Sequence, residues 1–326
     1  MKRVLLLVLI GSLSWLSFAD DARELPKGTL RLSQSTSFAF AVSEFNLDGD
    51  KVEVPVGSGR FMGLNLGAEL EMGIIDWLAV SVDWAPAWNV WSTFDYPAPD
   101  DKMTMNGGYD IFAALRLQLL GERGLIQSRH LRLVLSPGGK IPLPSPDWLE
   151  EINKGFDGEH WRAVANDYHT PGLGGRGSFD LVLTEMIYLN LYAEYIRYLP
   201  KDFVESSKLA YENPDYSKVD YGYKLTAEAE PHIGFRLSEG IRLEACLPVT
   251  FRRTPELQFD RSAVANSDTY RLEAGPSLAL LFSKPAMEVE LSYTYPILGK
   301  GLPNDPEALA MNALSLQLRS YLRIYR

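Results

Sequence analysis

Cysteine is nearly absent from the sequence, with Cys246 the single one among 326 residues. One cysteine cannot form a disulfide within the chain, and it excludes zinc and iron–sulfur sites that are built from cysteines of one chain. No metal ion and no cofactor is therefore expected. A basic excess is absent too, since 42 acidic residues against 32 lysines and arginines give a net charge of −10. Nucleic-acid binding needs a basic surface, so no nucleic acid is expected as a partner.

Long apolar runs are missing after the N-terminus, where no segment approaches the ~18 residues that a transmembrane helix needs. Residues 4–19 are apolar, follow the basic residues Lys2 and Arg3, and end on a small-x-small sequence at Ala19. This pattern predicts a cleaved secretory signal peptide over residues 1–19, with an N-terminal membrane anchor as the alternative. The exported chain is then either soluble outside the inner membrane or a β-barrel in an outer membrane.

The sequence does contain apolar and polar residues in strict alternation. In residues 61–73, methionine, leucine and alanine fill the even positions, whereas glycine, asparagine and glutamate fill most of the odd ones. A period of two indicates a strand with one apolar and one polar face. Twelve such runs cover residues 29–42, 60–74, 76–91, 108–120, 128–138, 173–184, 187–199, 222–237, 240–253, 269–283, 286–296 and 311–325.

The segments that connect these runs alternate between short and long. An even number of strands, short periplasmic turns and long extracellular loops are typical of outer-membrane barrels. We therefore predict an all-β fold for residues 20–326, a single antiparallel transmembrane β-barrel of about twelve strands. Aromatic residues near the ends of the runs, such as Trp84, Tyr188 and Tyr295, predict the interfacial girdles of such a barrel.

The polar face of the predicted strands would line the lumen. The candidate lumen or binding residues are Glu69, Glu71, Asp83, Arg116, Arg132, Glu228, Glu230, His232, Arg242, Glu244, Arg271, Glu273, Glu288, Glu290, Arg319 and Arg323. Neighbouring strands are expected to set Glu288 and Glu290 against Arg319 and Arg323. Two interpretations stay open: these charges pair and hold the interior together, or they set ion selectivity.

Two segments are similar to known outer-membrane proteins. Residues 67–80 (GAELEMGIIDWLAV) form a strand, tight turn and strand, and residues 136–144 read SPGGKIPLP. Together with the signal peptide and the twelve runs, they resemble putative outer-membrane transporters of the phenol-degradation-pathway group. They resemble more loosely the fatty-acid and hydrophobic-compound channels. The resemblance implies a transmembrane barrel that passes small molecules.

The N-terminal end of the predicted barrel domain differs from the fatty-acid channels, whereas its C-terminal run resembles a known assembly signal. The fatty-acid channels carry a long N-terminal hatch, whereas only residues 20–28 precede the first run here. A hatch mechanism is therefore not expected. The C-terminal run, Leu314–Tyr325, resembles the signal that the barrel-assembly machinery reads, which predicts that machinery as a partner. It departs from the usual pattern because the chain ends on Arg326 rather than on an aromatic residue.

The longest connection, residues 139–172, is predicted to be an extracellular loop with short helices. After Asp147, four apolar residues follow at roughly helical spacing: Trp148, Ile152, Phe156 and Trp161. One interpretation is a constriction loop that folds over or into the pore mouth. The other is an external cap that packs on neighbouring loops.

Of the four histidines, His130 is expected at a periplasmic turn and His232 in the lumen, and His160 and His169 have no nucleophile at a recognisable spacing. Asp167 with His169 is the one candidate pair for a barrel aspartyl protease, and a single pair is weak evidence. The protein is therefore not expected to be an enzyme. The leading prediction is an outer-membrane channel or transporter for small solutes or small hydrophobic compounds, with membrane lipids and a small-molecule substrate as partners. The alternative is a non-conducting structural or adhesive barrel with acidic surface loops.

Overall fold

The computed structural model describes residues 22, 25–53, 61–92, 104–107, 110–144, 147, 149–150, 153, 168–203, 213–301 and 308–324. The predicted signal peptide lies outside these residues, as do Trp148, Ile152, Phe156 and Trp161 of the predicted constriction loop. Within the described part of the chain, no helix has the length and apolar character needed to cross a membrane.

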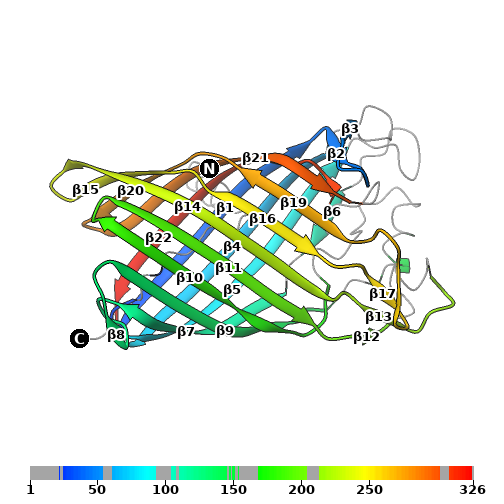
Figure 1. Cartoon of the computed structure of the whole chain (residues 1–326), viewed down its shortest axis with the longest axis horizontal. Coiled ribbons are helices and arrows are strands. Elements are labelled where there is room, and N and C mark those ends of the chain that lie inside the picture. The colour runs from blue at the N-terminus through cyan, green and yellow to red at the C-terminus, as the bar shows by residue number, and fades with distance from the viewer. Residues whose placement is uncertain are drawn as a thin grey trace.

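The described residues form a closed antiparallel barrel of twelve strands, as the alternation predicts (Figure 1). Each strand pairs with the next along the chain, and the last pairs with the first. The wall contains β1 (Thr29–Ala41), β4 (Phe61–Ile75), β5 (Leu78–Ser92), β7 (Ile111–Gly121), β9 (Leu131–Ile141), β10 (Gly172–Thr184), β11 (Ile187–Tyr198), β14 (Tyr223–Ser238), β15 with β16 (Ile241–Cys246, Val249–Thr254), β19 with β20 (Thr269–Ala274, Ser277–Ser283), β21 (Ala286–Lys300) and β22 (Asn312–Arg323).

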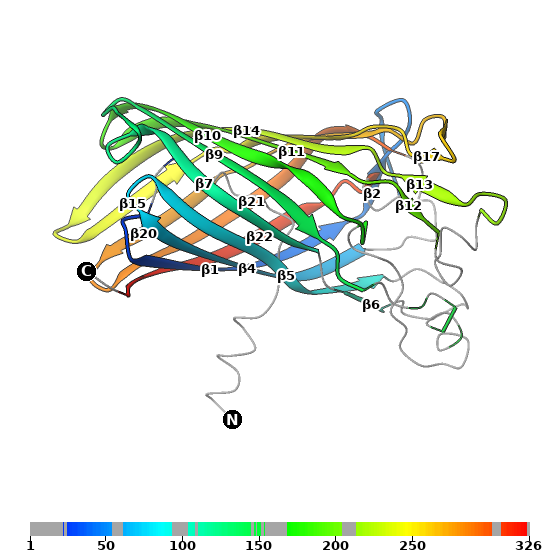
Figure 2. The ribbon, with the colours of Figure 1, turned by 90° about the horizontal axis from the view of Figure 1, so that it is seen from below.

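The two ends of the barrel differ in their connections. Seven short strands lie in the long connections: β2 (Ser43–Phe45), β3 (Lys51–Glu53), β6 (Thr104–Gly107), β12 (Lys201–Asp202), β13 (Lys218–Asp220), β17 (Gln258–Phe259) and β18 (Ser262–Ala263). They gather at one end, the long-connection end (Figure 2). The opposite, short-turn end carries the tight turns and β8 (Ile126–Gln127), and β1 begins and β22 ends there.

Two predicted runs are each divided by a proline. The run 240–253 breaks at Leu247-Pro248 between β15 and β16, and the run 269–283 breaks at Gly275-Pro276 between β19 and β20. The two breaks lie side by side in the wall. Cys246 pairs with Ser277 on one side of them, and Val249 pairs with Ala274 on the other. Proline lacks the N–H that a sheet ladder needs. Gly275 N still donates to Pro248 O at 3.3 Å, so a backbone hydrogen bond crosses the interruption.

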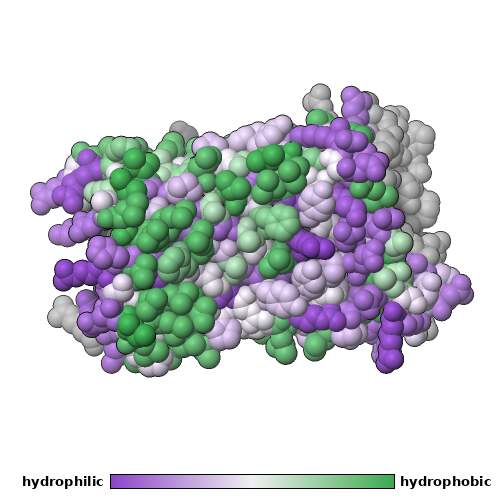
Figure 3. All heavy atoms as spheres, viewed as in Figure 1, coloured by the Kyte–Doolittle hydropathy of each residue, from purple (hydrophilic) through white to green (hydrophobic). Residues whose placement is uncertain are grey.

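The two faces of the wall have opposite polarity. On β4, Glu71 faces inward and is 0% exposed, whereas its neighbour Leu70 faces outward and is 46% exposed. Alternation alone cannot show which face points inward, and here the polar face does. Figure 3 shows hydrophobic residues gathered over the side of the barrel, with hydrophilic residues at both ends. An apolar exterior around a polar interior is the arrangement of a transmembrane barrel, because lipid replaces water outside.

Candidate functional site

The inward-facing charges are held in clusters of hydrogen-bonded pairs. On β1, β4 and β7, Arg31 Nη2 contacts Glu71 Oε2 at 2.6 Å and Glu69 Oε1 at 3.2 Å, and Arg116 Nε lies 3.4 Å from Glu71 Oε2. Glu71 therefore lies between two guanidinium groups. All but Glu69 are at least 95% buried in their side chains.

A second cluster lies on β5, β10 and β11. Arg176 donates through Nε to Glu194 Oε2 at 2.6 Å and through Nη1 to Asp83. Its guanidinium carbon also lies 4.1 Å from the centre of the Phe112 ring. One arginine thus joins four strands of the wall through charge, hydrogen bonds and a cation–π contact.

Two further clusters contain three more of the predicted lumen residues, Arg132, Arg271 and Glu273. Asp180 accepts hydrogen bonds from Arg132 Nη1 at 3.2 Å and from Asn190 Nδ2 at 2.7 Å. On the other side, Glu273 Oε2 accepts from Arg252 Nη1 at 3.0 Å and its Oε1 lies 2.8 Å from Arg271 Nε.

Glu228 accepts a hydrogen bond from the Thr250 hydroxyl on the neighbouring strand β16. Glu228 itself is 6% exposed. The hydroxyl of Thr250 thus keeps this buried carboxylate hydrogen-bonded.

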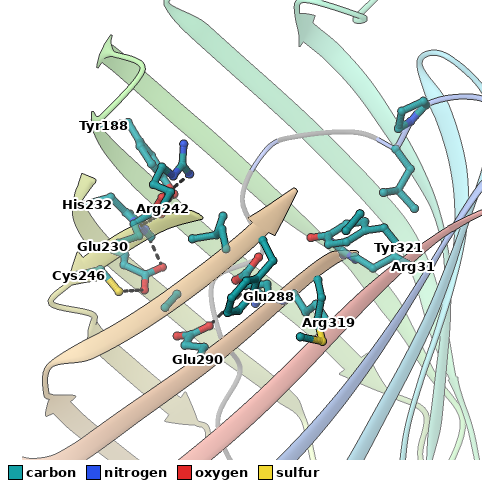
Figure 4. Close-up of a pocket in the computed structure, with 18 of the residues that line it drawn as sticks. Arg31, Tyr188, Glu230, His232, Arg242, Cys246, Glu288, Glu290, Arg319 and Tyr321 are labelled. Carbon is teal, nitrogen blue, oxygen red and sulfur yellow. Dashed lines mark hydrogen bonds and ion pairs between the residues drawn. The ribbon is translucent and has the colours of Figure 1, made fainter. Parts of the chain in front are cut away.

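A cavity of about 360 Å³ opens between these clusters near the short-turn end (Figure 4). On the β14–β15 side, His232 Nδ1 lies 2.8 Å from Glu244 Oε1, and Glu244 also accepts hydrogen bonds from Tyr188 Oη and Arg242 Nη2. The Tyr188 ring stacks on the His232 ring, with the centroids 4.1 Å apart. Glu230 and Cys246 complete this side of the cavity.

The opposite side of the cavity comes from β21 and β22. Arg319 Nη1 donates to Glu288 Oε1 and lies 3.6 Å from Glu290 Oε2. Ser277 Oγ donates to Glu290 Oε1 at 2.5 Å. The cavity is therefore lined by carboxylates and guanidinium groups from both sides, and a solute inside it would meet fixed charges of both signs.

Aromatic side chains fill the interior toward the long-connection end. Phe112 and Tyr198 are each 1% exposed, and the Tyr168 ring stacks on Tyr221 with the centroids 4.2 Å apart. At the long-connection end, Arg197 near the end of β11 donates to both carboxylate oxygens of Asp220 in β13, at 2.6 and 2.7 Å. This hydrogen bonding from Arg197 lowers the pKa of Asp220.

Fifteen of the sixteen predicted lumen residues lie in the interior clusters described above, and their binding role stays a prediction. Arg323 does not join Glu288 and Glu290 as expected. It lies three residues beyond Ser320, the last β22 residue that pairs with β21, and is exposed. Tyr188, expected in an interfacial girdle, instead faces the lumen, because its hydroxyl binds buried Glu244.

One interior feature was not predicted from the sequence: Ala22, Leu25 and Pro26, which precede β1, lie inside the barrel. Ala22 is fully buried: its N donates to Asp180 Oδ1 at 3.3 Å, and its O accepts from Gln118 Nε2 at 2.8 Å. Leu25 and Pro26 line the cavity. The sequence before β1 has no apolar–polar periodicity. The position of Ala22 is evident only from its hydrogen bonds to Asp180 and Gln118 on the wall.

No family model and no curated protein matches this sequence. Among solved structures, the COG4313 outer membrane channel from Pseudomonas putida F1 aligns with a TM-score of 0.67 over 94% of this chain and 100% of that chain, at 12% sequence identity. This chain has the fold of an outer-membrane β-barrel. A FadL homologue from Pseudomonas aeruginosa aligns at a TM-score of 0.34 and 9% identity over 91% of this chain and 90% of its own. The CymD monoaromatic hydrocarbon channel aligns at a TM-score of 0.37 and 8% identity over 92% of this chain and 90% of its own. TM-scores of 0.34 and 0.37 are too low to support any similarity beyond this fold.

Proposed function

We propose that this protein is an outer-membrane channel through which small solutes cross. The observation that carries the proposal is the inverted polarity of the wall, apolar outside and charged inside, around a cavity of about 360 Å³. Twelve strands lie between barrels of ~8 strands, which side chains fill, and those of ~16, which leave a water-filled channel. The carboxylates and guanidinium groups favour a small hydrated solute over a hydrophobic one, because apolar matter against polar groups cannot replace the hydrogen bonds that water makes to them.

The proposal includes an orientation and an export route. Residues 1–19 are removed on export, the short-turn end faces the periplasm, and the long-connection end faces outward. The barrel-assembly machinery recognises β22, which is the last strand made. Membrane lipids surround the apolar wall, and the protein has no catalytic role.

Single-channel recording in a planar lipid bilayer tests the proposal. Refolded protein is expected to give discrete conductance steps, because the lumen is lined by polar groups that water can solvate. Heat-modifiable gel mobility of the same sample shows that the barrel is folded. Folded protein that gives no steps would contradict a channel and favour the structural or adhesive barrel.

Two charge-neutralising substitutions then test whether solutes pass through this cavity. Arg242→Gln removes a positive charge and Glu288→Gln removes a negative one from opposite sides of the cavity. We expect the reversal potential in a salt gradient to shift toward cation selectivity for the first variant and toward anion selectivity for the second. Identical reversal potentials for both variants and the unmodified protein would place the conduction path elsewhere.

We also propose that the connection between β9 and β10 constricts the pore, through Trp148, Ile152, Phe156 and Trp161. The buried aromatic rings of Phe112 and Tyr198 support this, since they narrow the interior at the end where the connection attaches. Deletion of residues 148–165 is expected to raise the single-channel conductance. Unchanged conductance of the folded deletion variant would instead favour an external cap.

A further inference from the structure

We propose that Glu230, His232 and Cys246 form a binding site for Zn²⁺ or another divalent transition-metal ion in the lumen. Their ligand atoms, one carboxylate oxygen, one imidazole nitrogen and one thiol sulfur, all lie within 4.8 Å of one another. The cysteine count excludes sites built from several cysteines, but it leaves a mixed site with one thiolate open. Carboxylate, imidazole and thiolate are all established Zn²⁺ ligands.

The separations between these atoms fit a shared metal ion. Cys246 Sγ donates to Glu230 Oε1 at 2.9 Å, and His232 Nε2 lies 3.2 Å from Glu230 Oε2. Tetrahedral Zn²⁺ with ordinary bond lengths separates its N, O and S ligand atoms by about 3.3–3.6 Å. The remaining separation, between His232 and Cys246, is at most 4.8 Å. The side chains therefore need to close by no more than about 1 Å to share one ion.

The imidazole is also held as metal-bound imidazoles are. His232 Nδ1 lies 2.8 Å from Glu244 Oε1, and Glu244 is fixed in turn by Tyr188 and Arg242. A carboxylate on one ring nitrogen orients the other nitrogen toward the metal, which is the usual second shell of a histidine ligand. In this protein, Glu244 is a positioning residue for the site.

A second observation concerns His232 Nε2, which lies close to the Glu230 carboxylate but makes no hydrogen bond to it. His232 Nε2 is buried and makes no hydrogen bond within the described part of the chain, and its side chain is 10% exposed. This atom points toward Glu230 and Cys246. Because a buried polar atom without a hydrogen bond is costly, a metal ion at this point would satisfy it.

Strand pairing brings these three residues together beside the break in the wall. His232 and Cys246 are cross-strand partners of β14 and β15, and Glu230 lies two residues before His232 on the same inward face. At Leu247 and Pro248 the ladder is interrupted, and Leu247 N donates back to Pro231 O at 3.4 Å. The site thus lies next to the broken point of the wall, and all three residues line the cavity.

Titration calorimetry with ZnCl₂ tests the proposal on refolded protein in detergent, without a polyhistidine tag. We expect one ion per chain, and His232→Ala and Cys246→Ala are each expected to weaken binding by about 100-fold or more. Glu244→Gln is expected to weaken it by about 10–100-fold, as second-shell changes do. Co²⁺ is the spectroscopic probe, and its thiolate absorption should disappear in Cys246→Ala.

His130→Ala is the matched control, since it removes a histidine at the short-turn end, outside the cavity, whose Nδ1 lies near Val182 O. It should bind Zn²⁺ as the unmodified protein does. Binding that survives both His232→Ala and Cys246→Ala, or folded protein that binds no Zn²⁺, would overturn the proposal. The second outcome would make His232 a protonated bridge between Glu230 and Glu244. None of these results depends on whether the barrel conducts.

Discussion

Glu71→Leu is expected to lower the free energy of unfolding by about 3–5 kcal/mol, the usual cost of removing one partner from a buried ion pair. Glu71 is fully buried and lies 2.6 Å from Arg31 Nη2 and 3.4 Å from Arg116 Nε. Leucine would leave two buried guanidinium groups without the carboxylate between them. Denaturant titration of the refolded barrel, followed by the fluorescence of the six tryptophans in residues 20–326, measures the change.

Glu69→Gln is the control for this prediction. The Glu69 side chain is 21% exposed, and its Oε1 lies 3.2 Å from Arg31 Nη2. Because water partly screens this pair, the control should cost no more than about 1 kcal/mol. An equal decrease in the free energy of unfolding for Glu71→Leu and Glu69→Gln would mean that Glu71 is not the centre of the cluster with Arg31 and Arg116.

Leu115→Arg is expected to destabilise the barrel in lipid vesicles by about 2–4 kcal/mol, the cost of an arginine on the lipid face near the bilayer midplane. Leu115 lies in the middle of β7 and is 50% exposed on the outer face. In water such a substitution changes stability by only about 0.5 kcal/mol. The free energy of unfolding of Leu115→Arg in vesicles therefore shows whether lipid or water surrounds the wall.

Leu125→Arg is the control, because Leu125 is similarly exposed, at 56%, but lies in the connection after β7. We expect little change for this variant. A Leu115→Arg barrel as stable as the control would contradict a lipid-facing wall.

The fold was predictable because the period of two determines both the strands and the residues that share a face. Glu69 and Glu71 alternate with Leu70 and Met72, so all four could be assigned to faces from the sequence. Alternation also located β21, but the observed strand runs to Lys300, four residues past the predicted end. The alternation of apolar and polar residues fades at strand ends, so it does not determine where a strand stops.

The contacts of the site were less predictable because they depend on register and strand length. Arg323 shares the inward phase of Arg319, yet only Arg319 reaches β21. Tyr188 has the same sequence context as an interfacial tyrosine, and only its partner Glu244 on another strand identifies it as a lumen residue. The cluster of Glu230, His232 and Cys246 needs the pairing of β14 with β15, which the sequence does not give.

The pairing of β1 with β22 has a consequence for the order of assembly. Thr29 pairs with Arg323, so the strand pairing that closes the barrel joins residues far apart in the sequence. Until β22 has been synthesised and exported, β1 and β21 each present an unpaired edge, which is prone to aggregation. Contacts this distant in sequence also make folding slow. The chain must therefore be kept from premature pairing during its whole passage, and a copy that lacks its final twelve residues would never complete the ring.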